Sequence, residues 1–283
     1  MYLVELDIFS GRPNPTWILS GTEEDELVDR VTADKSLMIP ISADTGGLGY
    51  RGYIISRIDE MNEGSKKPKL PSTFRIGGQY DVKQVDALWL LDTSEKPDTE
   101  VEDYLREEVQ GAIRKSKEAS LSIPDLDLER SNWVKCSSNY FTSSSDFSFW
   151  NGSSYITKNN CYNYASNKRT NSFAQPGRHS GRQFSGSPTC SKVSTAIIYD
   201  GWKNNCQYNN NLNICLVIKP GTNADFHFYR KASDKWCHKP GTTAARNTDN
   251  AGRVITNPET CDRGSYTDFC GYYYADNGLI NVS

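Results

Sequence analysis

A cysteine near the middle of the chain has the local sequence of a reactive thiol. Cys161 stands in the run Asn159-Asn160-Cys161-Tyr162-Asn163-Tyr164-Ala165. An Asn side chain at the start of a helix accepts a hydrogen bond from a free backbone N–H of the first turn, so Asn159 or Asn160 would cap a helix that begins at the cysteine. A thiol at this position feels the positive end of the helix dipole, which lowers its pKa and favours the nucleophilic thiolate. The alternative is that Cys161 is one half of a disulfide, since the chain has eight cysteines.

Two of the three histidines fall on neighbouring predicted strands. His227 lies in the alternating run 225–231, and His238 lies in the run 236–239, which Pro240 ends. A turn centred directly after Ala232 would place the two imidazoles opposite each other on one face of the hairpin. A shift of two residues in the register would keep them on that face, because side chains alternate along a strand.

Thiol catalysis needs an imidazole beside the sulfur and a third polar group that orients this imidazole. The sequence offers Cys161 as the nucleophile, His227 as the proton partner and His238 as the orienting group. Asp225 or Asp249 is an alternative orienting group. The alternative without catalysis is that His227 is an ordinary strand histidine that faces a polar surface.

Such a reaction also needs hydrogen-bond donors for the oxyanion that forms on the attacked carbonyl. The backbone N–H of Cys161 and a side-chain amide of Asn159 or Asn160 are the nearest candidates. No two cysteines have C-x-x-C spacing, so we expect neither a zinc site nor a cofactor.

The second half of the chain resembles a known family. An Asn/Cys/Tyr run that opens a helix, followed by an antiparallel meander with a His on one strand and a polar residue on the next, is similar to the papain-like cysteine hydrolases. The order Cys161, His227, His238 is similar to the cell-wall-peptidase branch of that superfamily. The resemblance covers residues 136–283. It implies an α+β domain whose cysteine-bearing helix packs on an antiparallel sheet, and hydrolysis of a peptide or amide substrate through an acyl-thioester on Cys161.

The elements that would position these residues are readable from hydrophobic periodicity and turn residues. In the second half we expect a helix that opens at Ser187-Pro188 and closes at Gly201, and strands at 213–219, 225–231 and 236–239. In the first half we expect strands at 2–8, 49–58 and 72–76, and helices at 20–31 and from Asp98 or Thr99 to Lys115. The first half thus predicts a smaller α+β unit. It has neither His nor Cys, so we assign it no catalytic residue and leave binding of a protein partner as one role for it.

Charge and cysteine usage both change near residue 130. Residues 1–130 contain 16 Lys and Arg against 26 Asp and Glu, a net charge of −10, whereas residues 131–283 contain 16 against 9, a net charge of +7. All eight cysteines also lie beyond residue 130. Such a break marks a domain boundary. We therefore expect an acidic domain at 1–115, a linker at 116–135 and a papain-like domain at 136–283.

The composition excludes some classes of protein and leaves one alternative open. A formal net charge of −3 lacks the excess of positive charge that is typical of nucleic-acid-binding proteins. No run approaches the ~18 apolar residues of a membrane span, and Glu5 and Asp7 interrupt any signal-peptide core. We expect a soluble protein, with secretion and a cytoplasmic location both open.

The alternative to the hydrolase is a disulfide-rich secreted binding module without catalysis. In it all eight cysteines would pair, and a surface rich in Tyr, Asn and Ser would recognise glycan or protein. Tyr272, Tyr273 and Tyr274 would line a carbohydrate or peptide cleft, or form the core and surface of one strand.

Overall fold

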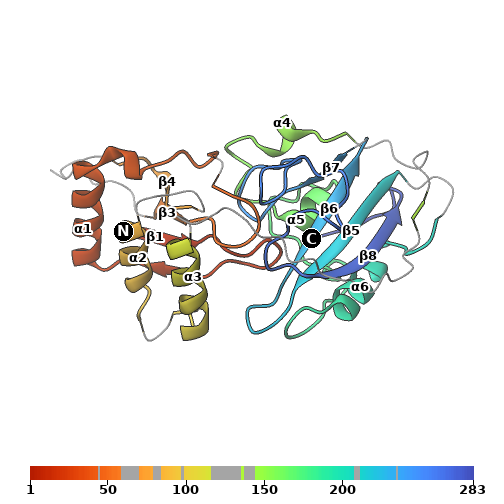
Figure 1. Cartoon of the computed structure of the whole chain (residues 1–283), viewed down its shortest axis with the longest axis horizontal. Coiled ribbons are helices and arrows are strands. Elements are labelled where there is room, and N and C mark those ends of the chain that lie inside the picture. The colour runs from red at the N-terminus through yellow and green to blue at the C-terminus, as the bar shows by residue number, and fades with distance from the viewer. Residues whose placement is uncertain are drawn as a thin grey trace. The chain divides into compact units, whose positions relative to one another are not determined.

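The protein forms two compact units, each with its own four-stranded antiparallel sheet (Figure 1). In the computed structural model, the described residues are 1–43, 45–58, 70–78, 84–96, 99–115, 135–136, 144–206, 211–233 and 235–283. The first unit comprises Met1–Ile8, Asn14–Gly46 and Tyr50–Ser120, and the second comprises Phe9–Pro13, Gly47–Gly49 and Leu121–Ser283. The fold is α+β. The predicted linker at 116–135 lies outside the described residues, apart from Lys135.

The sheet of the first unit has the strand order β2-β1-β3-β4. The strands are β1 (Tyr2–Leu6), β2 (Thr16–Ile18), β3 (Tyr53–Arg57) and β4 (Thr73–Ile76), and the helices are α1 (Gly21–Ala33), α2 (Gln84–Asp92) and α3 (Asp103–Lys115), with a short 3₁₀ helix η1 at Lys35–Leu37. The helix α1 begins where its capping residue predicted, because Ser20 and Glu23 form a capping box. The predicted strands and the two predicted helices of this unit are confirmed within a few residues, whereas α2 and β2 were not predicted.

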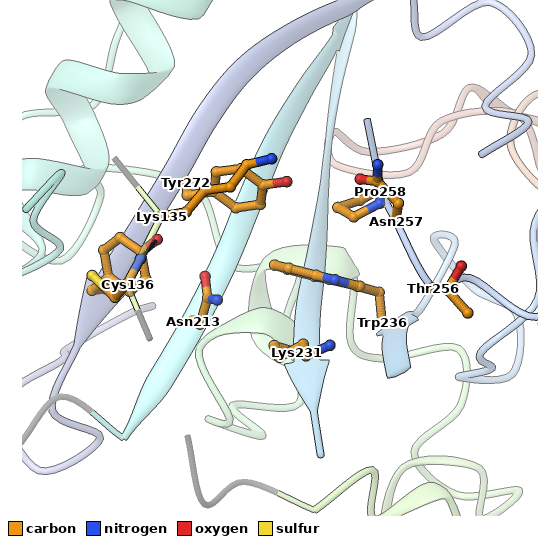
Figure 2. Close-up of a pocket in the computed structure, with 10 residues that line it drawn as sticks. Lys135, Cys136, Asn213, Lys231, Trp236, Thr256, Asn257, Pro258 and Tyr272 are labelled. Carbon is orange, nitrogen blue, oxygen red and sulfur yellow. Dashed lines mark hydrogen bonds between the residues drawn. The ribbon is translucent and has the colours of Figure 1, made fainter. Parts of the chain in front are cut away.

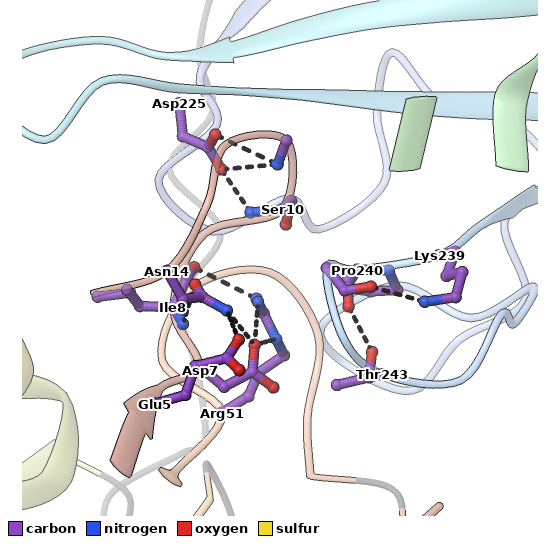
Figure 3. Close-up of polar contacts among 12 residues, drawn as sticks. Glu5, Asp7, Ile8, Ser10, Asn14, Arg51, Asp225, Lys239, Pro240 and Thr243 are labelled. Carbon is purple, nitrogen blue, oxygen red and sulfur yellow. Dashed lines mark hydrogen bonds and ion pairs between the residues drawn. The ribbon is translucent and has the colours of Figure 1, made fainter. Parts of the chain in front are cut away.

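A buried ion cluster lies in the first unit. The Asp7 carboxylate is 2.7 Å from the guanidinium groups of both Arg51 and Arg75, and all three side chains are fully buried. Figure 3 shows Asp7 against Arg51. Two cations on one buried carboxylate compensate part of the cost of removing these charges from water. The cluster therefore ties the end of β1 to the start of the segment that leads into β3 and to β4.

The sheet of the second unit has the strand order β7-β6-β5-β8. Its strands are β5 (Leu212–Lys219), β6 (Asp225–Ala232), β7 (Lys235–His238) and β8 (Asp268–Ala275), and its helices are α4 (Phe147–Trp150), α5 (Cys161–Ala165) and α6 (Cys190–Tyr199). The predicted meander β5-β6-β7 is confirmed. The run Tyr272 to Tyr274 forms the strand β8 on the other side of β5, with side chains on both faces.

The two faces of this sheet are covered differently. On one face, which we call the helix-covered face, α5 and α6 pack against apolar side chains that include Phe226 and Phe228 of β6. On the other face, which we call the loop-covered face, Tyr229 of β6 packs with Ile255 and Tyr266 from the loops that follow β7. Successive residues of a strand point to opposite faces, so each residue of β6 belongs to one of these two environments.

Half of the cysteines form disulfides. The bonds are Cys136–Cys206 and Cys190–Cys270, and the free thiols are Cys161, Cys215, Cys237 and Cys261. The expectation that all eight pair is therefore wrong. Three of the free thiols are buried in different hydrophobic clusters, which keeps them apart: Cys161 on the helix-covered face, Cys215 on the loop-covered face and Cys237 beside Trp150 and Tyr164.

Two further searches concern the described part of the chain. None of its helices combines the length and the apolar character needed to cross a bilayer. No group of three or more His, Cys, Asp or Glu within it is arranged to hold a metal ion.

Candidate functional site

The helix α5 begins at Cys161, as the capping residues predicted. The Asn160 side chain accepts hydrogen bonds from the backbone N–H groups of Tyr162 and Asn163, each at 3.1 Å. In return, the Asn163 side chain accepts from the backbone N–H of Asn160 at 2.9 Å. The helix is only five residues long. Its dipole is correspondingly small, so its effect on the thiol is weak.

The Cys161 thiol is buried rather than poised for reaction. Its side chain is fully buried in the cluster on the helix-covered face, and its sulfur lies 3.8 Å from the carbonyl oxygen of Phe226. Burial raises the pKa of the Cys161 thiol, and the nearby Asp225 carboxylate raises it further. The expectation of a lowered pKa is therefore wrong, because loss of hydration outweighs the short helix.

The two predicted histidines do form a hydrogen-bonded pair. Nε2 of His227 lies 2.9 Å from Nδ1 of His238, and both side chains are fully buried. Nε2 of His238 lies 2.9 Å from the carbonyl oxygen of Thr248. Because a carbonyl only accepts, this nitrogen carries a proton, and a neutral His238 then accepts at Nδ1 from the Nε2–H of His227. The strands pair Tyr229 with His238, two residues from the predicted register, and the two imidazoles share one face as expected.

The structure does not bring Cys161 to this pair. His227 packs with Tyr229 and Tyr266, at ring-centroid distances of 4.9 and 6.0 Å, on the loop-covered face. Cys161 packs with Phe226 on the helix-covered face. Phe226 and His227 are consecutive on β6 and point to opposite sides. The sheet itself therefore separates the predicted nucleophile from the predicted base.

The predicted oxyanion donors are engaged by the protein. The backbone N–H of Cys161 donates to the carbonyl oxygen of Ser10 at 3.4 Å. Nδ2 of Asn160 donates to the carbonyl oxygen of Gly11 at 2.7 Å. Both acceptors belong to the segment Phe9–Pro13, which the second unit includes. These donors therefore hold a loop in place.

The other candidate donor, Asn159, has a similar structural role. Its Nδ2 donates to the carbonyl oxygen of Tyr155 at 3.1 Å, and its Oδ1 accepts from the backbone N–H of Asn171 at 3.0 Å. Its own carbonyl oxygen accepts from the buried ammonium of Lys239 at 2.5 Å. The segment before α5 is thus fixed by a buried cation and by side-chain amides.

Neither alternative orienting carboxylate meets an imidazole in the contacts that the structure describes. Asp225 accepts from the backbone N–H groups of residues 10–12, at 2.6, 3.3 and 3.3 Å, and from the Tyr266 hydroxyl at 2.5 Å. Figure 3 shows the contact with Ser10. Asp249 accepts from backbone N–H groups in its own turn and pairs with Arg253 at 3.1 Å. Both carboxylates therefore organise loops.

A pocket of about 290 Å³ opens on the loop-covered face (Figure 2). The sequence patterns did not predict this pocket. Residues from all four strands and from two flanking segments line it: Lys135, Cys136, Asn213, Lys231, Trp236, Thr256, Asn257, Pro258, Tyr272 and Tyr274. Only the tyrosines were singled out from the sequence. The missed signal is the alternation in β5 and β6, which puts Asn213 and Lys231 on the same face as Trp236.

The chain is similar to a known shell protein. The chain is 44% identical over 126 residues to insoluble matrix shell protein 1 of Ruditapes philippinarum, and the aligned region is 44% of this chain and 83% of that protein. No family model matches the chain. No solved structure matches it either.

Proposed function

Because the chain belongs to the family of insoluble matrix shell protein 1, we propose that it is a non-catalytic component of an insoluble extracellular matrix, retained there by binding a matrix polymer. The observation that carries the proposal is 44% identity over 83% of that relative. The relative's name describes a matrix protein and mentions no reaction.

The geometry around Cys161 supports a role without catalysis. The thiol is fully buried, and its own backbone N–H is bound to a carbonyl oxygen of the chain. The two disulfides support an oxidising, extracellular location, since such bonds are rare in reducing compartments. They also suit a protein that must keep its fold outside the cell.

Co-sedimentation of the full chain with insoluble polymers tests this function. The panel is cellulose, chitin, collagen fibrils and calcium carbonate particles, with Cys161→Ala as the matched variant. We expect the wild type to sediment with at least one of these materials, and Cys161→Ala to sediment equally well. A chain that stays in the supernatant with every material would overturn the proposal.

A second candidate function is the thiol hydrolase with a papain-like fold. The observation that favours it is the hydrogen-bonded chain from His227 through His238 to the Thr248 carbonyl, which is how a catalytic base is held in one tautomer. In this reaction the Cys161 thiolate would attack the carbonyl carbon of a peptide or amide. The C–N bond would break as His227 protonates the leaving amine, and water would hydrolyse the thioester. The reaction requires Cys161 to leave its buried position, so labelling of this thiol in the native protein tests it.

A further inference from the structure

The pocket on the loop-covered face has a floor made by one row of residues across the sheet. Tyr274 of β8 pairs with Asn213 of β5, and Lys231 of β6 pairs with Trp236 of β7. The register of β5 and β6, in which Ile214 faces Arg230, places Asn213 beside Lys231 and joins the two pairs. An amide, an ammonium group and two aromatic rings therefore line one cavity. Figure 2 shows Asn213, Lys231 and Trp236 among its lining residues.

Asn213 is the feature of this row that calls for a ligand. Its side chain is only 5% exposed, and no described residue donates a hydrogen bond to its Oδ1. Leaving a buried acceptor without a donor is costly, so such groups are rare in folded proteins. Because Asn213 lines the pocket, a ligand that carries an O–H or N–H group there would satisfy this oxygen.

The wall of the pocket combines aromatic surface with cations. The rings of Trp236 and Tyr272 lie 5.6 Å apart, and each keeps a narrow strip exposed, 5% and 7% of the residue. The ammonium group of Lys231 lies 5.6 Å from the Trp236 ring, and that of Lys135 lies 5.5 Å from the Tyr272 ring. The pocket thus offers apolar contact, one unsatisfied acceptor and ammonium donors.

One side of the pocket is fixed covalently. Cys136, next to Lys135, is bonded to Cys206, and its backbone N–H donates to the Tyr274 hydroxyl at 3.0 Å. Lys135 also pairs with Glu259 at 2.5 Å. A preformed wall loses little conformational entropy when a ligand binds. These contacts therefore support a preformed binding site.

We infer that this pocket binds a sugar residue of a matrix glycan. The inference rests on the proposed matrix function and names the class of polymer that the protein binds. A sugar hydroxyl can donate to Asn213 Oδ1 and accept from Lys231, while the C–H groups of the ring contact Trp236 and Tyr272. A volume of about 290 Å³ is at the lower end of small-ligand sites, which suits one or two sugar rings.

A peptide strand suits the pocket less well. Peptides in extended conformation add to a sheet through the unpaired backbone groups of an edge strand. The floor of this pocket includes the central strands β5 and β6, whose neighbours on both sides already pair with them. Recognition here must therefore come from side chains, as it does for sugars.

Titration of the full chain with soluble oligosaccharides tests the inference. Tryptophan fluorescence would follow binding of N-acetylglucosamine, glucose and uronic acid oligomers, which separate acetamido, neutral and acidic sugars. We expect at least one series to bind the wild type, and Asn213→Leu to weaken that binding at least tenfold. Asn277→Leu is the matched control, because the Oδ1 of Asn277 is also buried without a described partner but lies outside the pocket. It should bind as the wild type does.

The melting temperature of each variant shows whether a loss of binding comes from a loss of fold. Asn213→Leu removes an unsatisfied acceptor, so it should melt no lower than the wild type, and loss of binding then cannot be loss of fold. Absence of binding to every oligosaccharide would overturn the inference, as would binding unchanged in Asn213→Leu, or binding only to peptides. If the wild type still sediments with collagen or calcium carbonate in those cases, the matrix function stands and only the glycan site is wrong.

Discussion

The reactivity of Cys161 separates the two proposed functions most directly. Brief treatment of the native protein with iodoacetamide at pH 8 should modify Cys261 first, because among the described free cysteines it is half-buried whereas Cys161, Cys215 and Cys237 are buried. Burial raises the pKa of Cys261 to about 11. At pH 8 roughly one thousandth of such a thiol is ionised, against roughly one quarter of an unperturbed thiol with a pKa of ~8.5. Even Cys261 should therefore react roughly 200-fold more slowly than free cysteine.

Cys161 should react more slowly still. Its side chain is fully buried, and burial raises the pKa of its thiol. Reaction then requires the surrounding structure to open. Opening that approaches global unfolding costs ~5–15 kcal/mol in a typical domain, which corresponds to protection of at least ~10³-fold.

The assay is mass spectrometry of the four thiol-bearing peptides after labelling for different times, with and without denaturant. Cys261→Ser is the control variant, and it should leave almost no label in the native protein. If Cys161 is modified before Cys261, the argument from burial is wrong, and the hydrolase becomes the better proposal.

Two further predictions concern stability. Asp7→Asn should cost ~3–5 kcal/mol in the unfolding transition of the first unit, because it removes the carboxylate that Arg51 and Arg75 share at 2.7 Å; a loss below about 1 kcal/mol in urea unfolding would contradict this. Burial also raises the pKa of the Cys161 and Cys215 thiols. The native state keeps these protons where the unfolded chain releases them, so stability is complete below pH ~8.5 and should fall above it by ~1.4 kcal/mol per pH unit for each thiol. Urea midpoints at pH 7, 9 and 10 measure this effect, and a flat profile would argue against it.

Local structure was predictable where local residues decide it. Asn160 caps α5 and Ser20 caps α1 because a side-chain oxygen satisfies a free N–H of the first turn, wherever the helix then packs. The shared face of His227 and His238 follows from the alternation of side chains in a hairpin. A register error of two residues left that conclusion unchanged.

The position of Cys161 relative to the histidines depends on which face of the sheet its helix packs against. Alternation fixes that Phe226 and Phe228 face one side of β6 and His227 the other. The helix that bears Cys161 packs on the side with the phenylalanines, because burial of apolar surface drives the contact. The run Phe-His-Phe therefore carried a signal against the catalytic triad, since a helix is more favourably placed on the apolar face.

Contacts that are distant in sequence could not be predicted from local patterns. The carboxylate of Asp225 binds the backbone N–H groups of residues 10–12, more than two hundred positions earlier in the chain. Those N–H groups belong to a turn-rich segment, and from the sequence this segment looks like a loop between two elements of the first unit. Its inclusion in the second unit explains why the first half alone does not describe a complete domain.

The loop-covered face carries both the histidine pair and the pocket, and the two differ in how their polar atoms are used. The imidazoles of His227 and His238 bind each other, and His238 also binds the Thr248 carbonyl, so this chain of hydrogen bonds ties β6 and β7 to the loop that follows them. A buried network that is bonded in this way specifies a fold. Asn213 instead keeps an acceptor without a described donor, and it does so beside a cavity. An acceptor left without a donor contributes nothing to folding, so this position supports the proposal that a ligand binds at the pocket.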